Sequence, residues 1–249
     1  MAAAGSVTDR PDPAAGPRAL SLARAGGSRG ATADTHPRAP LTRFADRRAA
    51  GRALAERLGP YPDAVVLGLP RGGVLVAAEV AAALHAPLDV LVVRKLGLPW
   101  QPELAMGAIA GAGDAVETVR VAGVLASAQV DEEAFAEVRG RELTELRRRE
   151  TAYRGDRPPV ALAGRDVVLV DDGLATGATM QAAVAAVRRQ QPRRIVVAIP
   201  IGSPRACSAL GPDVDELVCL DAPRSFRAVG QGYADFGETT DDEVRAALS

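Results

Sequence analysis

The chain has 249 residues, 47% of them hydrophobic, which is enough for one large α/β domain with or without a tail. Its formal net charge of −1 at pH 7 gives no overall basic field, so neither nucleic acid nor an anionic membrane is an expected partner. The two cysteines, Cys207 and Cys219, belong to no CxxC or Cys/His cluster, which argues against a disulfide framework and a zinc site.

Residues 1–40 are predicted to form a disordered tail. They are rich in Ala, Gly and Pro, contain no aromatic residue, and follow neither a helical nor a strand period. Such a stretch cannot bury enough apolar surface to offset its conformational entropy, although a start codon placed too far upstream is an alternative explanation. The tail lacks the apolar segment of a secretion signal, and no run in the chain approaches about 18 apolar residues, so we expect a cytoplasmic protein.

Residues 41–249 are predicted to form one domain in which apolar strands alternate with amphipathic helices. The first half gives a helix over 44–58, a strand over 64–69, a helix over 74–84, a strand over 88–93, and an antiparallel pair over 104–110 and 115–119. The second half gives a helix over 131–153, a strand over 167–170, a helix over 179–190, strands over 195–199 and 216–220, and a short helix over 241–248 capped by Thr239 or Thr240.

This order of elements indicates an α/β fold with a doubly wound, mostly parallel sheet flanked by helices. In such sheets ligands bind beyond the carboxyl ends of the strands. The most informative loops of the sequence follow predicted strands at that edge, and they are residues 70–73, 94–95, 171–179 and 200–203. We therefore expect these loops to share one site.

The loop from Asp171 to Thr179 carries the strongest functional signal. Two carboxylates directly follow a fully apolar strand, and small residues then lead into a helix. Neighbouring carboxylates suit the two hydroxyls of a diol, and a helix start with close backbone N–H groups suits a phosphate. An ordinary strand–turn–helix with a Thr cap is the plainer interpretation, but it does not account for the acid pair. No Gly-Lys-Ser/Thr or GxGxxG follows, so neither a Walker A loop nor a dinucleotide fold is supported.

Four apolar residues, two acids and a Thr-Gly-x-Thr end make this loop resemble the signature of the type I phosphoribosyltransferases. The resemblance extends over residues 43–249 and is closest to a bacterial subgroup with the sequence VDDGLATGAT; Gly173 departs from the larger residue usual in the family. It implies that Asp171 and Asp172 hold the ribose hydroxyls of phosphoribosyl diphosphate (PRPP). It also implies that the 5′-phosphate lies on Ala175, Thr176, Gly177, Ala178 and Thr179.

The resemblance assigns the other loops as well. Arg71, Gly72 and Gly73 would bind the diphosphate, with a strained or cis peptide at Arg71–Gly72. Arg94 and Lys95, the only lysine of the chain, would lie near the same group, and residues 96–103 would be a flexible loop over the site. Each of these segments is also compatible with a plain turn or a solvated strand end.

Three further assignments stay open. Trp100 fits a dimer contact, the core or the flexible loop equally well. Residues 200–203 could line the site or cap a helix. Residues 221–249 are predicted to be a small C-terminal hood or tail element, in which the aromatic stretch 223–236 either selects the acceptor or only packs.

These assignments imply a phosphoribosyltransferase that uses PRPP and Mg²⁺ and transfers the phosphoribosyl group to a nitrogenous acceptor, with Asp171, Asp172, Arg71 and Lys95 as catalytic residues. No direct protein ligand to Mg²⁺ is expected, because substrate oxygens would hold it and Asp171 and Asp172 would reach it only through water. The acid that assists purine salvage relatives is missing at residues 174–176, which argues against a guanine or hypoxanthine acceptor.

The alternative is a regulatory protein that senses PRPP or nucleotides on the same fold, since fold and ligand site alone do not separate the two. No nucleophile elbow, metal cluster or N-terminal cysteine supports a hydrolase or a glutamine amidotransferase. A homodimer is implied by the resemblance only.

Overall fold

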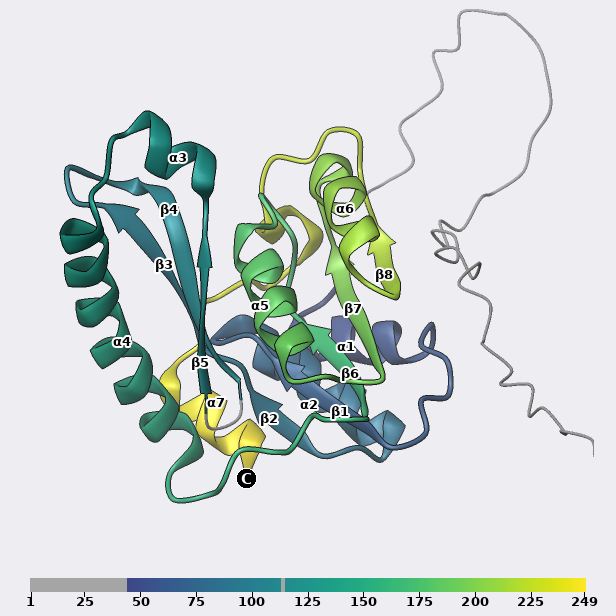
Figure 1. Ribbon diagram of the computed structural model, residues 1–249. Helices are drawn as coiled ribbons and strands as arrows, with labels where there is room; N and C mark the ends of the chain where they lie inside the picture. Colours follow the sequence, from purple (N-terminus) through teal and green to yellow (C-terminus); the bar gives the residue numbers. More distant parts are fainter. Residues whose placement is uncertain (1–43, 113–114) are drawn as a thin grey trace, which may run out of the picture.

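The computed structural model describes residues 44–112 and 115–249, so the predicted tail 1–40 lies outside the described residues. Its centre is a five-stranded parallel sheet in the order β2-β1-β6-β7-β8 (Figure 1). The strands are β1 (Ala64–Gly68), β2 (Leu88–Val90), β6 (Asp166–Val170), β7 (Arg194–Ile201) and β8 (Glu216–Asp221). The strand order places the first predicted strand beside the one that precedes the two acids.

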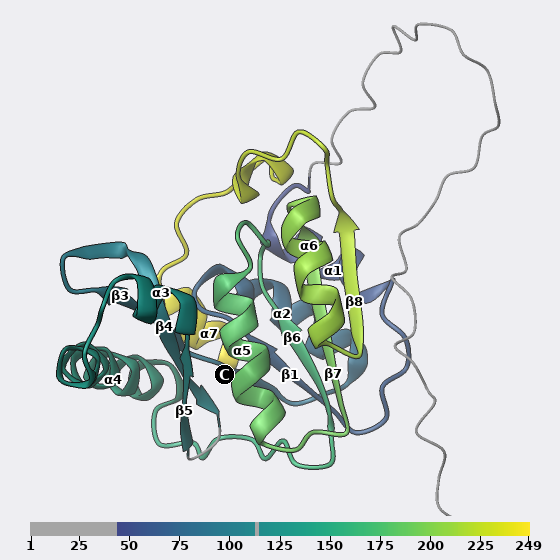
Figure 2. The ribbon, with the colours of Figure 1, turned by 45° about the horizontal axis from the view of Figure 1, so that its top comes forward.

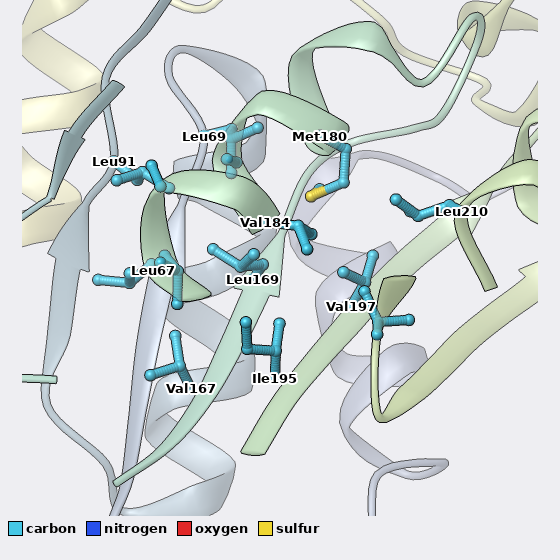
Figure 3. Packing of buried hydrophobic residues seen from close by; sticks show 14 of the residues in the cluster. Leu67, Leu69, Leu91, Val167, Leu169, Met180, Val184, Ile195, Val197 and Leu210 are labelled. Carbon is cyan, nitrogen blue, oxygen red and sulfur yellow. The ribbon is translucent and has the colours of Figure 1, made fainter. Parts of the chain in front are cut away.

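Helices cover both faces of this sheet, as the apolar runs of the strands predicted. One face packs against α1 (Arg47–Ala55) and α2 (Gly72–Leu84). The other packs against α5 (Ala178–Arg189) and α6 (Pro204–Leu210). Figure 3 shows the second core, where leucine and valine side chains of the strands meet Met180 and Val184 of α5. The predicted doubly wound α/β fold is confirmed.

A second sheet of three antiparallel strands stands beside the first, in the order β3-β4-β5. Its strands are β3 (Val93–Leu98), β4 (Gln101–Ala112) and β5 (Ala115–Arg120), and they are followed by α3 (Ala122–Ser127) and α4 (Glu132–Arg154). The long helix α4 packs on this sheet through Phe135, Val138 and Leu146 (Figure 1). The predicted antiparallel pair is therefore confirmed as part of a larger unit; residues 113–114 of its turn are not described.

One predicted strand is divided in two. The sequence favoured a single strand over 88–93, but β2 ends at Val90 and β3 begins at Val93. The Leu91 amide still donates to the Gly68 carbonyl at 3.0 Å, and the chain then leaves β1 to pair with β4. Continuous apolar sequence does not reveal this change of partner, because both segments are buried.

The C-terminal segment links the two units. A short helical turn, η1 (Gly211–Asp213), leads from α6 toward β8. After β8 the chain crosses above the carboxyl ends of the strands, passes through a second short turn, η2 (Val229–Gly232), and ends in α7 (Asp241–Leu248). Figure 2 shows this course from β8 to α7, which lies beside α4. Thr240 caps α7 in a reciprocal arrangement with Glu243, so Thr240 is the correct choice of the two predicted caps.

The N-terminal helix begins later than predicted. Asp46 accepts a hydrogen bond from the Ala49 amide and starts α1 at Arg47. Phe44 instead pairs with Tyr233, with its amide donating to Gly232 O at 2.8 Å. Within residues 44–112 and 115–249, no helix is long and apolar enough to span a membrane.

Candidate functional site

Two loops meet at the carboxyl edge of the parallel sheet. They follow β1 and β6, which are neighbours in register, with Gly68 opposite Val170. A Cβ on Gly73 would lie 2.8 Å from the Asp171 Cα, and one on Gly72 would lie 2.0 Å from Asp172 Oδ2. The two glycines are therefore required for the turn 70–73 to touch the acid pair, and the structure brings these two predicted segments together.

Asp171 and Asp172 each have one oxygen held and one oxygen open. Asp171 Oδ1 accepts from the Asp172 amide at 2.8 Å, and Asp172 Oδ2 accepts from Arg47 Nε at 2.8 Å. Among the described residues, nothing donates to the second oxygen of either carboxylate. Two adjacent open acceptors match two adjacent hydroxyl groups.

Burial changes the pKa of both carboxyl groups of this pair. It raises the pKa of Asp171 well above the ordinary value, and the negative charge of Asp172 raises it further. Burial also raises the pKa of Asp172, while the hydrogen bond and charge of Arg47 oppose that rise. The site thus favours a ligand that brings hydrogen-bond donors or positive charge to the carboxylates.

The loop after the acids is held by hydrogen bonds at Leu174 and is exposed to solvent at the next two residues. Leu174 is held against the end of β7, since its amide donates to Ile201 O at 2.9 Å and its carbonyl accepts from the Ser203 amide at 2.8 Å. Gly177 has φ +84°, a left-handed conformation that favours glycine, and α5 starts at the next residue. Ala175 and Thr176 are exposed. The Ala178 amide at the start of α5 makes a long bond to Thr176 Oγ1, at 3.5 Å, and the exposed residues beside it leave this helix start accessible, as an anion site requires.

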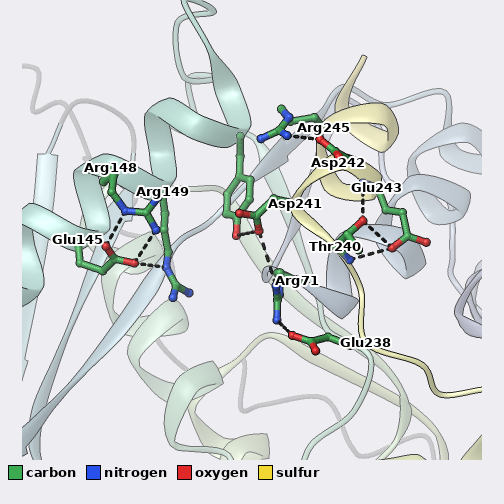
Figure 4. A network of polar contacts seen from close by, with 11 residues as sticks. Arg71, Glu145, Arg148, Arg149, Glu238, Thr240, Asp241, Asp242, Glu243 and Arg245 are labelled. Carbon is green, nitrogen blue, oxygen red and sulfur yellow. Dashed lines mark hydrogen bonds and ion pairs between the residues drawn. The ribbon is translucent and has the colours of Figure 1, made fainter.

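Two of the basic residues that were predicted to lie near the diphosphate, Arg71 and Arg94, are paired with acidic side chains of the protein. Arg71 is ion-paired with Glu238 and lies 3.9 Å from Asp241 Oδ1 (Figure 4). Arg94 Nε donates to Glu142 Oε2 of α4 at 2.8 Å. Because side chains alternate along β3, Lys95 projects to the opposite face, which carries Val93 and packs toward α5. The structure therefore separates the predicted basic pair, with exposed Lys95 on the α5 side and Arg94 turned toward α4.

The unusual peptide bond lies one position before the predicted one. The cis bond joins Pro70 to Arg71, not Arg71 to Gly72. The Leu69 amide still donates to Val170 O at 2.9 Å, and Gly72 is already the first residue of α2. The turn between β1 and α2 therefore lies between Leu69 and Gly72.

Sequence reasoning missed Arg47. Its side chain is only 12% exposed, and besides the bond to Asp172 it donates from Nη1 to Gly237 O at 2.8 Å. The guanidinium also lies over the Phe236 ring, 4.0 Å from the centroid. The available signal was an arginine on the apolar face of the first helix, three and seven residues before Ala50 and Leu54.

The C-terminal segment covers the acid pair from the side of Arg47. The Tyr233 hydroxyl donates to Asp172 O at 2.5 Å, and its ring stacks on Phe236 at 4.9 Å. A Cβ on Gly173 would lie 2.4 Å from Val229 Cγ1, which explains the glycine where the resembled family has a larger residue. This contact means that part of the predicted hood lies directly on the acid loop.

A cavity of about 220 Å³ lies beside Arg47, between α1 and the C-terminal segment. Its walls carry charges of both signs, from Asp46, Arg48, Asp235, Glu238 and Glu243 among others. None of residues 171–179 lines it, so this cavity is separate from that loop. Arg47 lines the cavity and also bonds to Asp172.

Known proteins share this sequence and architecture. The profile of the phosphoribosyl transferase domain matches residues 45–230. Protein Rv0571c of Mycobacterium tuberculosis, provisionally named a phosphoribosyl transferase, is 50% identical over 209 residues, which are 82% of this chain and 46% of that protein. The chain thus spans about half the length of this curated relative.

A solved structure agrees over nearly its full length. The protein TT1426 from Thermus thermophilus is 49% identical to this chain, with a TM-score of 0.73. The match covers 83% of this chain and 97% of TT1426. The chain belongs to the phosphoribosyl transferase domain family.

Proposed function

We propose that this protein binds PRPP with Mg²⁺ and transfers its phosphoribosyl group to a nitrogenous acceptor, releasing diphosphate. The observation that carries the proposal is the acid pair. Two carboxylates, each with an open oxygen, lie between a glycine turn and the start of a helix on adjacent strands. This arrangement offers acceptors to a sugar diol with an anion site on either side.

Each part of PRPP is assigned to a part of this edge. Asp171 and Asp172 accept from the two ribose hydroxyls. The 5′-phosphate occupies the start of α5, from Ala175 to Thr179. The diphosphate lies on the turn of Arg71, Gly72 and Gly73, and Lys95 reaches it from β3. Arg94 contributes only if it releases Glu142, which holds it in this structure.

The reaction then needs fixed geometry and charge stabilisation. The bond from C1 to the diphosphate oxygen breaks, and its electron pair leaves with the diphosphate. A lone pair of the acceptor nitrogen forms the new bond to C1 from the opposite face, and the acceptor loses a proton to solvent. Positive charge develops on the ribose ring, as in glycoside cleavage, and the negative charge of the carboxylates that hold the ribose hydroxyls stabilises it.

Mg²⁺ fits this site as a partner of the substrate. Within the described chain, no group of three or more His, Cys, Asp or Glu side chains is arranged to hold a metal. The open oxygens of Asp171 and Asp172 are hard ligands that suit Mg²⁺ through its water shell. When bound, Mg²⁺ would neutralise charge on the leaving diphosphate, with Asp171 and Asp172 as the protein residues that would hold it through water.

A PRPP- or nucleotide-sensing protein is the second candidate. It is favoured by one observation, that Arg71 and Arg94 are both engaged with carboxylates of the protein. A sensor needs to bind PRPP but has no need to free these cations for a leaving group. Cytoplasmic location and a homodimer stay predictions under either function.

The test is diphosphate release from PRPP and MgCl₂ with a panel of purine and pyrimidine bases and related nitrogen heterocycles. Release with one acceptor supports the transferase, and binding of PRPP without release across the panel favours the sensor. The double variant Asp171→Asn/Asp172→Asn should lose PRPP binding. The control, Asp156→Asn/Asp213→Asn, removes two exposed carboxylates elsewhere and should bind PRPP normally. Unchanged PRPP affinity in the first variant contradicts the proposed site.

A further inference from the structure

Arg47 is fixed on three sides at the centre of the site. Its Nε bonds to Asp172 Oδ2 at 2.8 Å, its Nη1 bonds to Gly237 O at 2.8 Å, and its guanidinium plane lies on the Phe236 ring. A Cβ on Gly72 would also lie only 2.6 Å from Nε, so the side chain touches the turn 70–73. These contacts leave Arg47 little freedom to leave Asp172.

The bond to Arg47 determines which oxygen of Asp172 remains available. A carboxylate held through one oxygen by a fixed donor presents the other oxygen in a fixed direction. Asp171 is held in the same manner by the Asp172 amide. Both open oxygens are therefore set by the protein before any ligand arrives, which is the condition for tight binding of a rigid diol.

Arg47 also supplies the charge that two neighbouring carboxylates need. Buried like charges next to each other repel, and a paired cation reduces that cost. The Asp172 salt bridge is with Arg47, whose side chain is 12% exposed against 18% for Asp172. Arg71, on the neighbouring turn, is paired with Glu238 instead.

We infer that Arg47 is a positioning residue for sugar recognition, which holds Asp172 so that its open oxygen accepts from a ribose hydroxyl. This inference rests on the proposed function. It assigns Arg47 to the diol and not to the diphosphate, although the side chain also touches the turn on which the diphosphate is proposed to lie. The two assignments differ in which part of PRPP the residue helps to bind.

The experiment separates the two halves of the substrate. Isothermal titration calorimetry measures binding of ribose 5-phosphate, which has the diol and the phosphate, and of inorganic diphosphate, which has neither the diol nor the sugar. Arg47→Ala should weaken ribose 5-phosphate by at least about tenfold, because it removes one partner of a mostly buried ion pair. Diphosphate affinity should change by less than about twofold, although Arg47 touches the turn 70–73, because its guanidinium is engaged by Asp172, Gly237 and the Phe236 ring.

Three further comparisons test whether the effect of Arg47→Ala is purely structural. Arg47→Lys keeps the charge but lacks the fixed Nε–H, so its ribose 5-phosphate affinity should fall between wild type and Arg47→Ala. Arg48→Ala removes the next arginine, which is half-exposed and paired with Glu79, and should bind both ligands normally. In an Asp172→Asn background, Arg47→Ala should cost little more, since the residue it positions is already altered.

Each other result overturns the inference. Unchanged ribose 5-phosphate binding in Arg47→Ala shows that Asp172 does not need it. An equal loss of diphosphate binding shows that Arg47 is not specific to the sugar half of the substrate. Additive losses with Asp172→Asn show that the two act separately. If the wild-type protein binds neither ribose 5-phosphate nor PRPP, the proposed function itself fails and this inference with it.

Discussion

The buried Asp171 carboxyl group lowers the stability of the folded protein, and a ligand that donates a hydrogen bond to it would reduce this loss. Burial and the neighbouring charge of Asp172 raise its pKa, so the folded protein binds a proton more tightly than the unfolded chain does. The folded state then becomes less stable as pH rises from the unfolded pKa, about 3.9, through the raised folded value. At pH values above the unfolded pKa this buried carboxyl group opposes folding, and a sugar hydroxyl that donates to its carboxylate would reduce that opposition.

Asp171→Asn should therefore stabilise the ligand-free protein. The amide oxygen can still accept from the Asp172 amide, but the buried negative charge is gone. The gain in melting temperature over wild type should be small near about pH 4 and larger near about pH 8, because the raised pKa of Asp171 lowers the stability of the wild type alone as the pH rises. Thermal unfolding by circular dichroism at the two pH values measures it. A lower melting temperature for the variant at the higher pH would contradict this account.

Gly73 should tolerate no side chain, in contrast to an exposed glycine in α4. Gly73→Ala places a Cβ 2.8 Å from backbone at Asp171, and relieving such a contact costs about 1 to 3 kcal/mol of stability. Gly140→Ala has nothing within 4 Å and lies inside a helix, so it should raise stability by about 0.5 to 1 kcal/mol. Urea unfolding of both variants provides the comparison, and opposite signs are expected.

The sequence predicted the acid pair and the glycine turn because their chemistry is local and unusual. Carboxylates after an apolar strand and paired glycines after another strand can be recognised without knowing the fold. Arg47 and Gly173 could not be assigned in this way. Their roles depend on Asp172 and Val229, which lie far away along the chain and meet them only after folding.

The C-terminal segment acts on the site from two directions. Tyr233 and Val229 pack on the acid loop, and Glu238 holds Arg71 of the glycine turn. The Glu238 side chain is 78% exposed, so its ion pair with Arg71 is weak. Under the proposed function, the segment would compete with the diphosphate for Arg71 while supporting the loop beside it.

Glu238→Gln should strengthen diphosphate binding. Loss of the competing carboxylate frees Arg71, and an exposed ion pair of this kind accounts for up to about fivefold in affinity. Calorimetry with inorganic diphosphate measures the change, and Asp242→Asn, which removes a neighbouring carboxylate paired with Arg245, is the matched control. Weaker binding in Glu238→Gln would show that Glu238 helps to place Arg71 for the ligand.

The strands and helices were predicted well where one pattern covers one element, and poorly where the chain changes partners. Apolar continuity predicted β1, β6 and β7, which are buried on both faces. The same continuity joined β2 to the start of β3, since burial alone carries no information about which strand is the neighbour. As a result, Arg94 and Lys95 were expected at a strand end, but they lie within β3 on opposite faces.

The two sheets are joined by a buried ion pair. Asp89 of β2 accepts from Arg154 Nε of α4 at 3.0 Å and from the Val160 amide at 3.1 Å. The side chains of Asp89 and Arg154 are 9% and 11% exposed, respectively. This contact spans 65 residues of sequence and fixes the antiparallel unit against the parallel sheet. No local pattern predicts it, since both residues appear in the sequence as ordinary charges.

Asp89→Ala should destabilise the protein by about 3 kcal/mol or more, because it leaves the Arg154 charge buried without its partner. Chemical denaturation measures the loss. Glu132→Ala breaks the exposed pair with Arg120 and should change stability far less. Equal effects of the two substitutions would show that the Asp89 contact does not hold the units together.

The fluorescence of Trp100 reports on the turn between β3 and β4 of the second sheet. It is the only tryptophan of the chain, it sits in the turn where β3 passes into β4, and it is 63% exposed. Native fluorescence above the tyrosine background therefore comes from one hairpin tip alone. If that tip folds down over a bound ligand, its emission will shift toward the blue and become protected from iodide quenching, whereas a rigid hairpin will leave the spectrum as it is.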